Sequence, residues 1–437
     1  MSHDSRATRP IPTIRVARRR CTRTKQSQDH APFPRGALLV VASAIFISMS
    51  TEFLPGGLLP NISSTFGRPV TDVGQLVTVF ATAVILTTAP LAVVTRKVPR
   101  KPLAIIALIG ITAVTALAAL APTFEVLLAA RAFGGIAHGL FWSVAAAYAA
   151  NLVPSSQLGR ATAITAAGGS VAGVLGGPLG NLLGQLFGWR AAFAVFAVLG
   201  VGVVILVLRL LPSATPIARP RRSVADDRSA APSALPSILL VCLTILILVI
   251  GQTTYGTYSV VWLGEAASIP PAAIPAFLFG SGLAAFVAVS AIGRVADRFP
   301  IGALVLAVIL VALLNMLYPF AAAWGIIALV IISLGQAMAF ALVPLLLQAR
   351  MMRTAPPHQR STAAALQTTA FNIAIGGGAV LGALVVESWG IEALPGTAAL
   401  CATVGLVVLL LSSRPAARSA DQSPAASSSD TEATDAH

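Results

Sequence analysis

The sequence has little charge, few cysteines and few lysines. Only 10% of its 437 residues are charged, whereas a soluble domain carries about 25%, so the composition excludes an ordinary soluble protein. Cys21, Cys242 and Cys401 lie far apart and lack the spacing of a metal site or a disulfide framework. None of the three lysines follows a glycine, which excludes a Walker-type phosphate loop. We therefore expect no metal, no nucleotide and no other cofactor.

Long apolar runs are what the chain has instead. A membrane-spanning helix needs about 20 mostly apolar residues, and the sequence contains twelve such segments. In the first part of the chain we predict spans at 36–60, 72–95, 102–121, 125–150, 159–184 and 189–211. In the second part we predict spans at 237–262, 270–292, 301–320, 323–347, 361–386 and 392–412. The predicted fold class is an all-α membrane protein with twelve transmembrane helices.

The basic residues are distributed unevenly between the two sides of this predicted bundle. All of the 29 basic residues except Arg68, Arg131 and Arg190 fall in the tails, near the central linker or in alternate loops. Because lysine and arginine near span ends favour the cytosolic side, we predict a multi-pass protein of the cell membrane (plasma or inner membrane) with both termini in the cytosol. The net charge of +14 could also indicate nucleic-acid binding. This topology explains the charge, and we expect no nucleic-acid partner.

The chain divides into two similar halves. At an offset near 200 residues, Arg160 matches Arg360 and Trp189 matches Trp389. We predict a basic cytosolic tail at 1–35, a six-helix bundle at 36–211, a cytosolic linker at 212–236, a second six-helix bundle at 237–412 and a disordered cytosolic tail at 413–437. Two parallel six-span halves around a central cavity are typical of transporters, whose substrate site lies near the membrane midplane.

Two charged residues fall inside predicted spans of the first half, where charge is costly and usually functional. Glu52 and Arg131 lie about 12 Å and 9 Å from the same end of the bundle at 1.5 Å per residue, so we expect them to pair or to share a hydrogen-bond network. Burial favours the neutral carboxyl group and a nearby arginine favours the ionised one. Movement of Arg131 or entry of water would therefore switch Glu52, as proton coupling requires. A structural ion pair that fixes helix packing is the alternative.

His138 is the third candidate for proton coupling. It lies seven residues beyond Arg131, so both side chains leave the helix on one face. A solvated histidine titrates near neutral pH, and His138 could relay protons or bind substrate. A neutral histidine that only packs in the core explains it as well.

The second half offers amide and aromatic side chains rather than charges, and Gln252 occupies the repeat position of Glu52. A cavity with one charged half and one polar, aromatic half suits amphiphilic organic substrates. Each aromatic residue also fits a simple packing role. The candidate substrate contacts are Phe141, Trp142, Gln252, Tyr255, Tyr258, Gln336, Phe340 and Asn372.

Glycines are concentrated in the fifth predicted span. Gly169, Gly173 and Gly177 recur every four residues, which strips one helix face of side chains and allows close backbone contact. Pro178 predicts a kink. The pattern fits tight packing alone, and it also fits a hinge or seal between the halves.

These motifs resemble the major facilitator superfamily, specifically its twelve-span drug:proton antiporters and, among them, arabinose-efflux and chloramphenicol-resistance permeases. The resemblance covers about residues 36–412. It rests on Thr51-Glu52-Phe53 with Gly57-Leu58-Leu59-Pro60, on Arg131, Gly135 and Gly139 in an Arg-x-x-x-Gly-x-x-x-Gly pattern, on Gly173, Gly177 and Pro178 with Asn181 in place of a second paired glycine, and on Gly293, Asp297 and Arg298 after the eighth span. The resemblance implies that Arg131 takes part in proton transfer and that the last two groups serve conformational change.

The sequence therefore predicts a proton-coupled exporter of small organic molecules (a drug, sugar or related metabolite) that works by alternating access and is not an enzyme. The direction of transport is implied by the resemblance. The expected partners are a small-molecule substrate, protons and the lipid bilayer, and we expect a monomer. Two alternatives remain open: a proton-independent facilitator or importer of a small metabolite, and a non-transporting receptor or assembly subunit. The lack of a sizeable soluble domain argues against the last.

Overall fold

The computed structural model describes residues 33–153, 157–212, 234–356 and 359–413. The predicted tails at 1–35 and 413–437 and the predicted linker at 212–236 lie outside these ranges, except for a few residues at their edges. Within the described ranges the chain forms helices and no strands.

Twelve long helices form the described part of the molecule, and all twelve are long and apolar enough to cross a membrane. The first half contains α2 (Arg35–Phe66), α3 (Val70–Val94), α4 (Arg100–Ala119), α5 (Phe124–Asn151), α6 (Leu158–Phe187) and α7 (Trp189–Leu210). The second half contains α8 (Leu235–Glu265), α9 (Ile274–Ala291), α11 (Pro300–Trp324), α12 (Ile326–Thr354), α13 (Arg360–Trp389) and α14 (Leu394–Ser413). The short helix α10 (Gly293–Arg298) and the 3₁₀ turns η1 (Thr95–Lys97), η4 (Pro271–Ala273) and η5 (Ile391–Ala393) lie between them. The predicted all-α membrane fold is confirmed.

Helix α2 is longer than the sequence predicted. The expected end at residue 60 was wrong, because α2 continues through Pro60 to Phe66 and ends at Gly67, whose φ of +61° is left-handed. Prolines are tolerated inside membrane helices because neighbouring helices can satisfy the backbone groups that a proline leaves without a partner. Glu52 therefore lies about 21 Å from this end of α2, at 1.5 Å per residue over 14 residues, rather than 12 Å.

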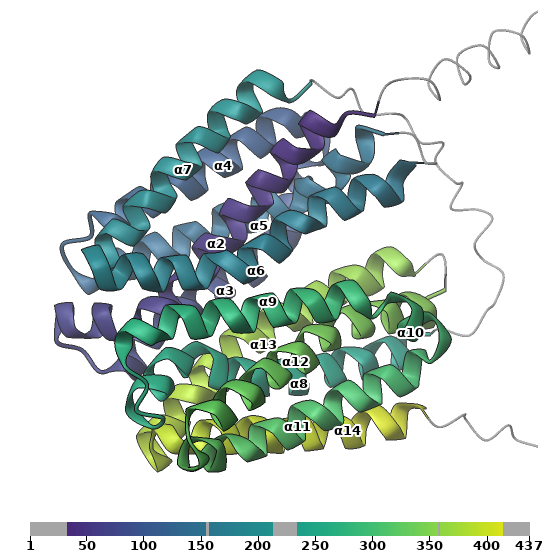
Figure 1. Ribbon diagram of the computed structural model, residues 1–437. Helices are drawn as coiled ribbons and strands as arrows, with labels where there is room; N and C mark the ends of the chain where they lie inside the picture. Colours follow the sequence, from purple (N-terminus) through teal and green to yellow (C-terminus); the bar gives the residue numbers. More distant parts are fainter. Residues whose placement is uncertain (1–32, 154–156, 213–233, 357–358, 414–437) are drawn as a thin grey trace, which may run out of the picture.

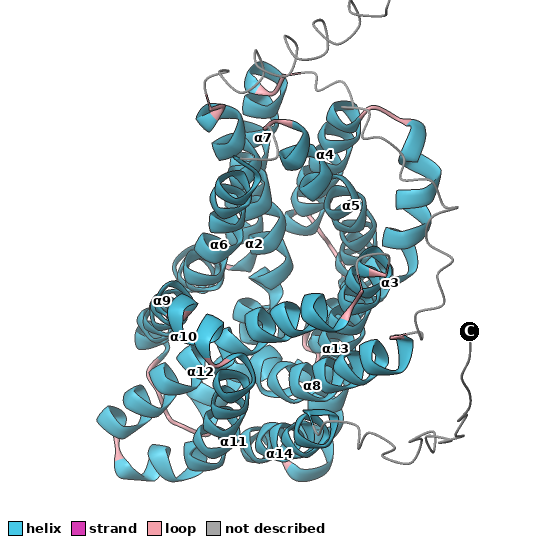
Figure 2. Cartoon of the chain, turned by 90° about the vertical axis from the view of Figure 1, so that its right-hand side faces the viewer, coloured by secondary structure: helices cyan, strands magenta, loops and turns pink. Residues whose placement is uncertain are grey.

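The helices form two bundles, α2–α7 and α8–α14, which Figure 1 shows in purple to teal and in teal-green to yellow. The bundles meet mainly along two seams, α3 against α13 and α6 against α9, and α2 also contacts α8 between them. Figure 2 shows both seams from one end of the molecule. We call the end where α2 begins and α14 finishes the termini end, and the opposite end the far end.

The described contacts between the halves lie from mid-height to the far end. Thr78 of α3 donates to the Gly376 carbonyl of α13 at 3.4 Å. Gln185 of α6 donates to the Pro271 carbonyl of η4 at 2.8 Å. Toward the termini end the ribbons of the two bundles diverge (Figure 1).

Connections at the far end are short. A single residue, Gly188, joins α6 to α7, and a single residue, Gly325, joins α11 to α12. Their φ angles of +85° and +102° lie in the region that favours glycine. Each pair of helices is therefore joined by a turn that only glycine makes without strain.

Candidate functional site

The buried guanidinium of Arg131 is held by main-chain carbonyl groups of α2 and α3. Its Nη1 atom donates to the Thr51 carbonyl at 2.8 Å, Nη2 to the Glu52 carbonyl at 3.2 Å and Nε to the Leu76 carbonyl at 3.3 Å. These hydrogen bonds offset part of the cost of burying a charged side chain that is only 4% exposed. The sequence predicted that Glu52 and Arg131 lie close together, and the hydrogen bond that joins them runs to the Glu52 carbonyl.

The Thr51 carbonyl is available to Arg131 because Pro55 follows it by four residues. In an α-helix the carbonyl of residue 51 accepts from the amide of residue 55, and proline has no N–H to give. Pro55 lies inside α2, so the Thr51 carbonyl loses its helical partner and is free to accept from Arg131. The proline thereby prepares the binding site of the guanidinium.

The Glu52 carboxylate faces His138 of α5. The His138 Nε2 atom lies 3.6 Å from Glu52 Oε2, and its Nδ1 atom lies 2.9 Å from the hydroxyl oxygen of Ser48. Ser48 is one helical turn before Glu52, so both point from α2 toward the histidine. The three side chains form a chain that can hold a proton between a carboxylate and an imidazole. The sequence singled out Glu52 and His138 but missed Ser48, whose only signal is its spacing of four residues from Glu52.

Phe80 of α3 lies against both Arg131 and His138. Its ring centroid is 4.1 Å from the Arg131 guanidinium carbon and 5.1 Å from the His138 ring centroid. A Cβ atom at Gly135 would collide with the Phe80 carbonyl, so glycine is needed there for α3 to lie this close to α5. This contact gives the Arg-x-x-x-Gly spacing of α5 a physical reason.

A void of about 10 Å³ borders Thr51, Phe80, Arg131 and His138. That is about the space of one water molecule.

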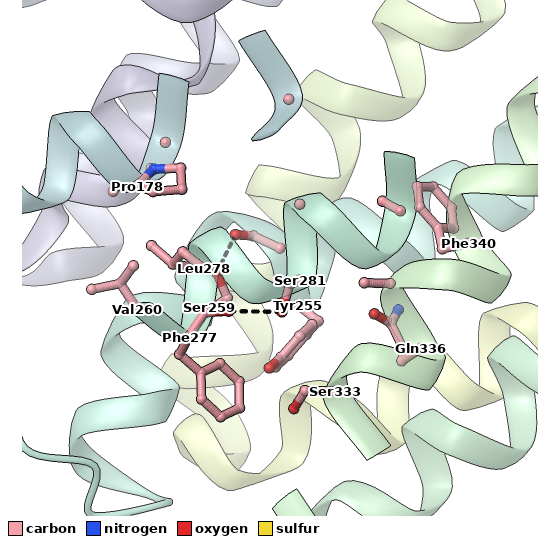
Figure 3. A pocket seen from close by; sticks show the side chains of 18 of the residues that line it. Pro178, Tyr255, Ser259, Val260, Phe277, Leu278, Ser281, Ser333, Gln336 and Phe340 are labelled. Carbon is pink, nitrogen blue, oxygen red and sulfur yellow. Dashed lines mark hydrogen bonds between the residues drawn. The ribbon is translucent and has the colours of Figure 1, made fainter. Parts of the chain in front are cut away.

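A larger cavity of about 430 Å³ lies between the two halves. Helices α2 and α6 form one wall, and α8, α9, α11 and α12 form the other (Figure 3). Four of the eight predicted substrate contacts line it: Gln252, Tyr255, Gln336 and Phe340. The sequence missed other lining residues, among them Phe53, Ser259, Phe277, Ser281, Tyr318 and Ser333, because nothing in an apolar span marks the helix face that borders a cavity.

The other four predicted contacts do not line this cavity. Phe141 is 2% exposed and packs in the core of the first half. Trp142 lies beside His138, with ring centroids 6.0 Å apart. Tyr258 is fully buried and donates to the Ala379 carbonyl at 3.2 Å. Asn372 donates within its own helix. Aromatic and amide residues also serve helix–helix contacts, and the sequence pattern alone does not separate the two uses.

The predicted conformational residues fall in two places. Gly173, Gly177 and Pro178 of α6 line the cavity. A Cβ atom added to Gly282 of α9 would lie 2.7 Å from Val174 Cα and 3.0 Å from the Gly173 carbonyl oxygen, so α6 and α9 touch through their backbones at mid-height.

The remaining predicted conformational residues, Gly293, Asp297 and Arg298, form part of α10, between α9 and α11. The guanidinium carbon of Arg298 lies 5.6 Å from the ring centroid of Phe299. This group is therefore at the termini end, away from the cavity.

Twelve membrane-crossing helices in two six-helix halves, with a cavity between the halves at mid-height, define a polytopic membrane transporter rather than an enzyme. Comparison of the amino-acid sequence with known families identifies the family of this transporter. The chain belongs to the major facilitator superfamily, because the model of that family matches residues 41–353.

Two relatives illustrate the similarity. A probable sugar efflux transporter of Mannheimia succiniciproducens is 31% identical over 86% of this chain and 93% of its own length. A chloramphenicol efflux pump of Mycobacterium tuberculosis is 31% identical over 80% of this chain and 86% of its own length.

Solved structures show the same fold at low sequence identity. A D-xylose–proton symporter superposes with a TM-score of 0.71 at 13% identity, covering 86% of this chain and 97% of the symporter. The human organic anion transporter MFSD10 superposes with a TM-score of 0.65 at 20% identity, covering 87% of this chain and all of that one.

Proposed function

We propose that the protein is a proton-coupled exporter of small organic molecules that works by alternating access, with the termini end in the cytosol. The observation that carries the proposal is the Glu52–His138 pair, which lies at mid-depth in a membrane bundle whose halves enclose a cavity. Ionisable groups at such depth are costly and usually serve function. The names of the relatives, a sugar efflux transporter and a chloramphenicol efflux pump, support export as the direction.

Glu52 carries the proton in this mechanism. An ionised Glu52 lies beside the positive charge of Arg131 and can accept a hydrogen bond from the neutral imidazole of His138, whose other ring nitrogen meets Ser48; these interactions tie α2 to α5. A proton that arrives from outside neutralises the carboxylate and weakens them. Arg131 keeps its hydrogen bonds to the α2 backbone throughout, so its positive charge stays beside Glu52 while the proton comes and goes.

The conformation fits the cytosol-facing step of this cycle. With the termini end in the cytosol, the far end faces outside, and the hydrogen bonds Thr78–Gly376 and Gln185–Pro271 close the outer part of the bundle. Substrate enters the cavity from the cytosol in this state. Release to the outside requires these contacts to break and the inner ends of the halves to meet.

The test is Glu52→Gln in proteoliposomes, with chloramphenicol as the transported probe. Glutamine keeps the size of the side chain but cannot lose a proton, so we expect accumulation driven by a pH gradient to fall at least about tenfold. Exchange of labelled for unlabelled chloramphenicol without a gradient should continue. Glu265→Gln, an exposed carboxylate at the far end of α8, is the control and should transport normally. Undiminished coupled transport by Glu52→Gln would reject the proton role and favour a facilitator.

A further inference from the structure

Two glutamine side chains from different helices meet in the wall of the central cavity. Gln336 of α12 donates a hydrogen bond from Nε2 to Oε1 of Gln252 on α8, at 2.7 Å. Both residues line the cavity, and Gln336 is only 4% exposed. The pair joins two helices of the second half at the surface that a bound molecule would touch (Figure 3 labels Gln336).

The pair leaves N–H donors and one carbonyl acceptor without a partner in the described part of the chain. A single hydrogen bond between two amides occupies the carbonyl of Gln252 and one N–H of Gln336. The amino group of Gln252 and the carbonyl of Gln336 have no other hydrogen-bond partner among the described residues. Reversing both amides exchanges these roles and still leaves a free amino group on one side chain and a free carbonyl on the other. A hydroxyl group matches this arrangement, because it accepts one hydrogen bond and donates another.

Aromatic rings flank the amide pair. Tyr255 lies one turn beyond Gln252 on α8, and Phe340 lies one turn beyond Gln336 on α12; both line the cavity. Tyr318 packs behind Tyr255 with ring centroids 5.1 Å apart, which fixes the position of that ring. The amide pair offers hydrogen bonds, and the rings of Tyr255 and Phe340 offer apolar surface beside it. This combination suits a ligand that carries hydroxyl groups on an apolar skeleton.

We propose that the Gln252–Gln336 pair is the selectivity element of the cavity, binding a hydroxyl group of an uncharged substrate whose apolar face packs against Tyr255 and Phe340. The proposal rests on the proposed transport function, which makes this cavity the substrate site. A methylated hydroxyl cannot donate, so such an analogue displaces water from the Gln336 carbonyl at the cavity surface and leaves that carbonyl unpaired. Sites that hydrogen-bond a substrate hydroxyl reject analogues that lack it for this reason.

Equilibrium binding to the purified full-length protein in lipid nanodiscs, without a pH gradient, tests the proposal. The probes are phenyl β-D-glucopyranoside with its tetra-O-methyl ether, and chloramphenicol with its di-O-methyl ether. Wild type should bind the hydroxylated member of at least one pair about tenfold or more tightly than the ether. Gln252→Leu and Gln336→Leu should each reduce that ratio to near one.

Asn315→Leu is the matched control. Asn315 is a fully buried amide of the same half, and it donates to the Val311 carbonyl within α11. This variant should keep the wild-type ratio. Thermal melting checks the folding of every variant. If the leucine variants do not fold, Gln252→Asn and Gln336→Asn replace them, since asparagine keeps the amide but is too short for the pair to meet.

Two results would overturn the proposal. One is a wild type that prefers neither hydroxylated probe over its ether. The other is a loss of affinity in the variants that is equal for both members of a pair, which would mean that the glutamines only support the cavity wall. Because binding needs no gradient, Glu52→Gln should keep the wild-type ratio. Failure of proton coupling and failure of hydroxyl selection are therefore measured separately.

Discussion

At the scale of single residues, the partners of Arg131 are the main result. The depths of Glu52 and Arg131 predicted that the two residues pair or share a hydrogen-bond network, and the seven-residue spacing predicted that His138 faces the same way as Arg131; in the structure Arg131 binds the Glu52 carbonyl and His138 lies beside the Glu52 carboxylate. The atoms involved could not be predicted. Whether the guanidinium meets a carboxylate or a carbonyl depends on the backbone position that Pro55 frees, and on how α2 turns toward α5, which no sequence pattern encodes.

The role assigned to Pro55 leads to a prediction for Pro55→Ala. Alanine restores the N–H that the Thr51 carbonyl lacks, so the helix competes with Arg131 for this acceptor. We expect unimpaired thermal stability, because proline in a helix interior costs about 3 kcal/mol relative to alanine. Transport driven by a pH gradient should fall about tenfold, because Arg131 loses a charge-assisted hydrogen bond of roughly 1.5–3 kcal/mol. Flux in proteoliposomes and thermal melting are the measurements.

Pro60→Ala is the control for this variant. Pro60 also lies inside α2, but it frees the carbonyl of residue 56, which Arg131 does not contact. Coupled transport should survive this change. Equal losses in both proline variants would attribute the effect to general bending of α2 and would count against the anchor at Thr51.

At the scale of helices, α6 uses its glycines on two faces. Cβ atoms at Gly176, Gly180 and Gly184 would strike side chains of α2, so these glycines pack α6 within its own half. At the seam the glycine that close contact requires is Gly282 of α9, which lies against the Gly173 carbonyl. The sequence predicted a glycine face at Gly169, Gly173 and Gly177 and left open whether it served packing or a seal. A Cβ atom at Gly173 or Gly177 would meet nothing within 4 Å, so this face borders the cavity, and its part in a hinge or seal stays a prediction.

Gly282→Val should hinder the closing of this seam. The added side chain starts 2.7 Å from Val174 Cα, and backbone there cannot give way cheaply, so we expect overpacking of about 1–3 kcal/mol against the observed conformation. Transport should slow about tenfold, and labelling of a cysteine at position 185 from the far end should speed up. Gly280→Val is the control, because a Cβ atom there makes only an ordinary 3.5 Å contact with Leu334. Similar slowing in both variants would contradict the role of the seam.

At the scale of the whole molecule, the sequence predicted twelve spans and two halves, and the structure has them. Each span can be predicted from the length and apolar composition of its own segment, without knowledge of the rest of the fold. The end at which the halves touch depends on contacts between segments about 300 residues apart, such as Thr78 and Gly376. In the alternating-access cycle that we propose, each end of the bundle closes in turn, so one sequence has to encode both sets of contacts and does not indicate which set is formed.

Locking the halves together should stop transport. A Cβ atom at Gly376 would lie 3.2 Å from Ala81 Cβ, a few tenths of an ångström below the usual spacing in a disulfide. In a background with the native cysteines replaced by alanine, oxidised Ala81→Cys/Gly376→Cys should lose at least about 90% of its flux, because alternating access requires this seam to open. A reducing agent should restore the flux.

Gly110→Cys/Ala137→Cys provides the matched disulfide within one half. These positions on α4 and α5 have a nearly identical Cβ separation of 3.1 Å. Oxidation of this pair should leave the flux unchanged. Full transport by the cross-linked Ala81–Gly376 pair would mean that the halves need not separate along α3 and α13.

The one-residue joints at Gly188 and Gly325 leave no slack between the helices that they connect. If α6 moves at the seam, α7 has to move with it, because only Gly188 separates the two helices. In the same way, a movement of α12 has to move α11 through Gly325. Lengthening either joint by a few glycines would uncouple the paired helices mechanically without changing any residue of the proposed proton site or of the cavity.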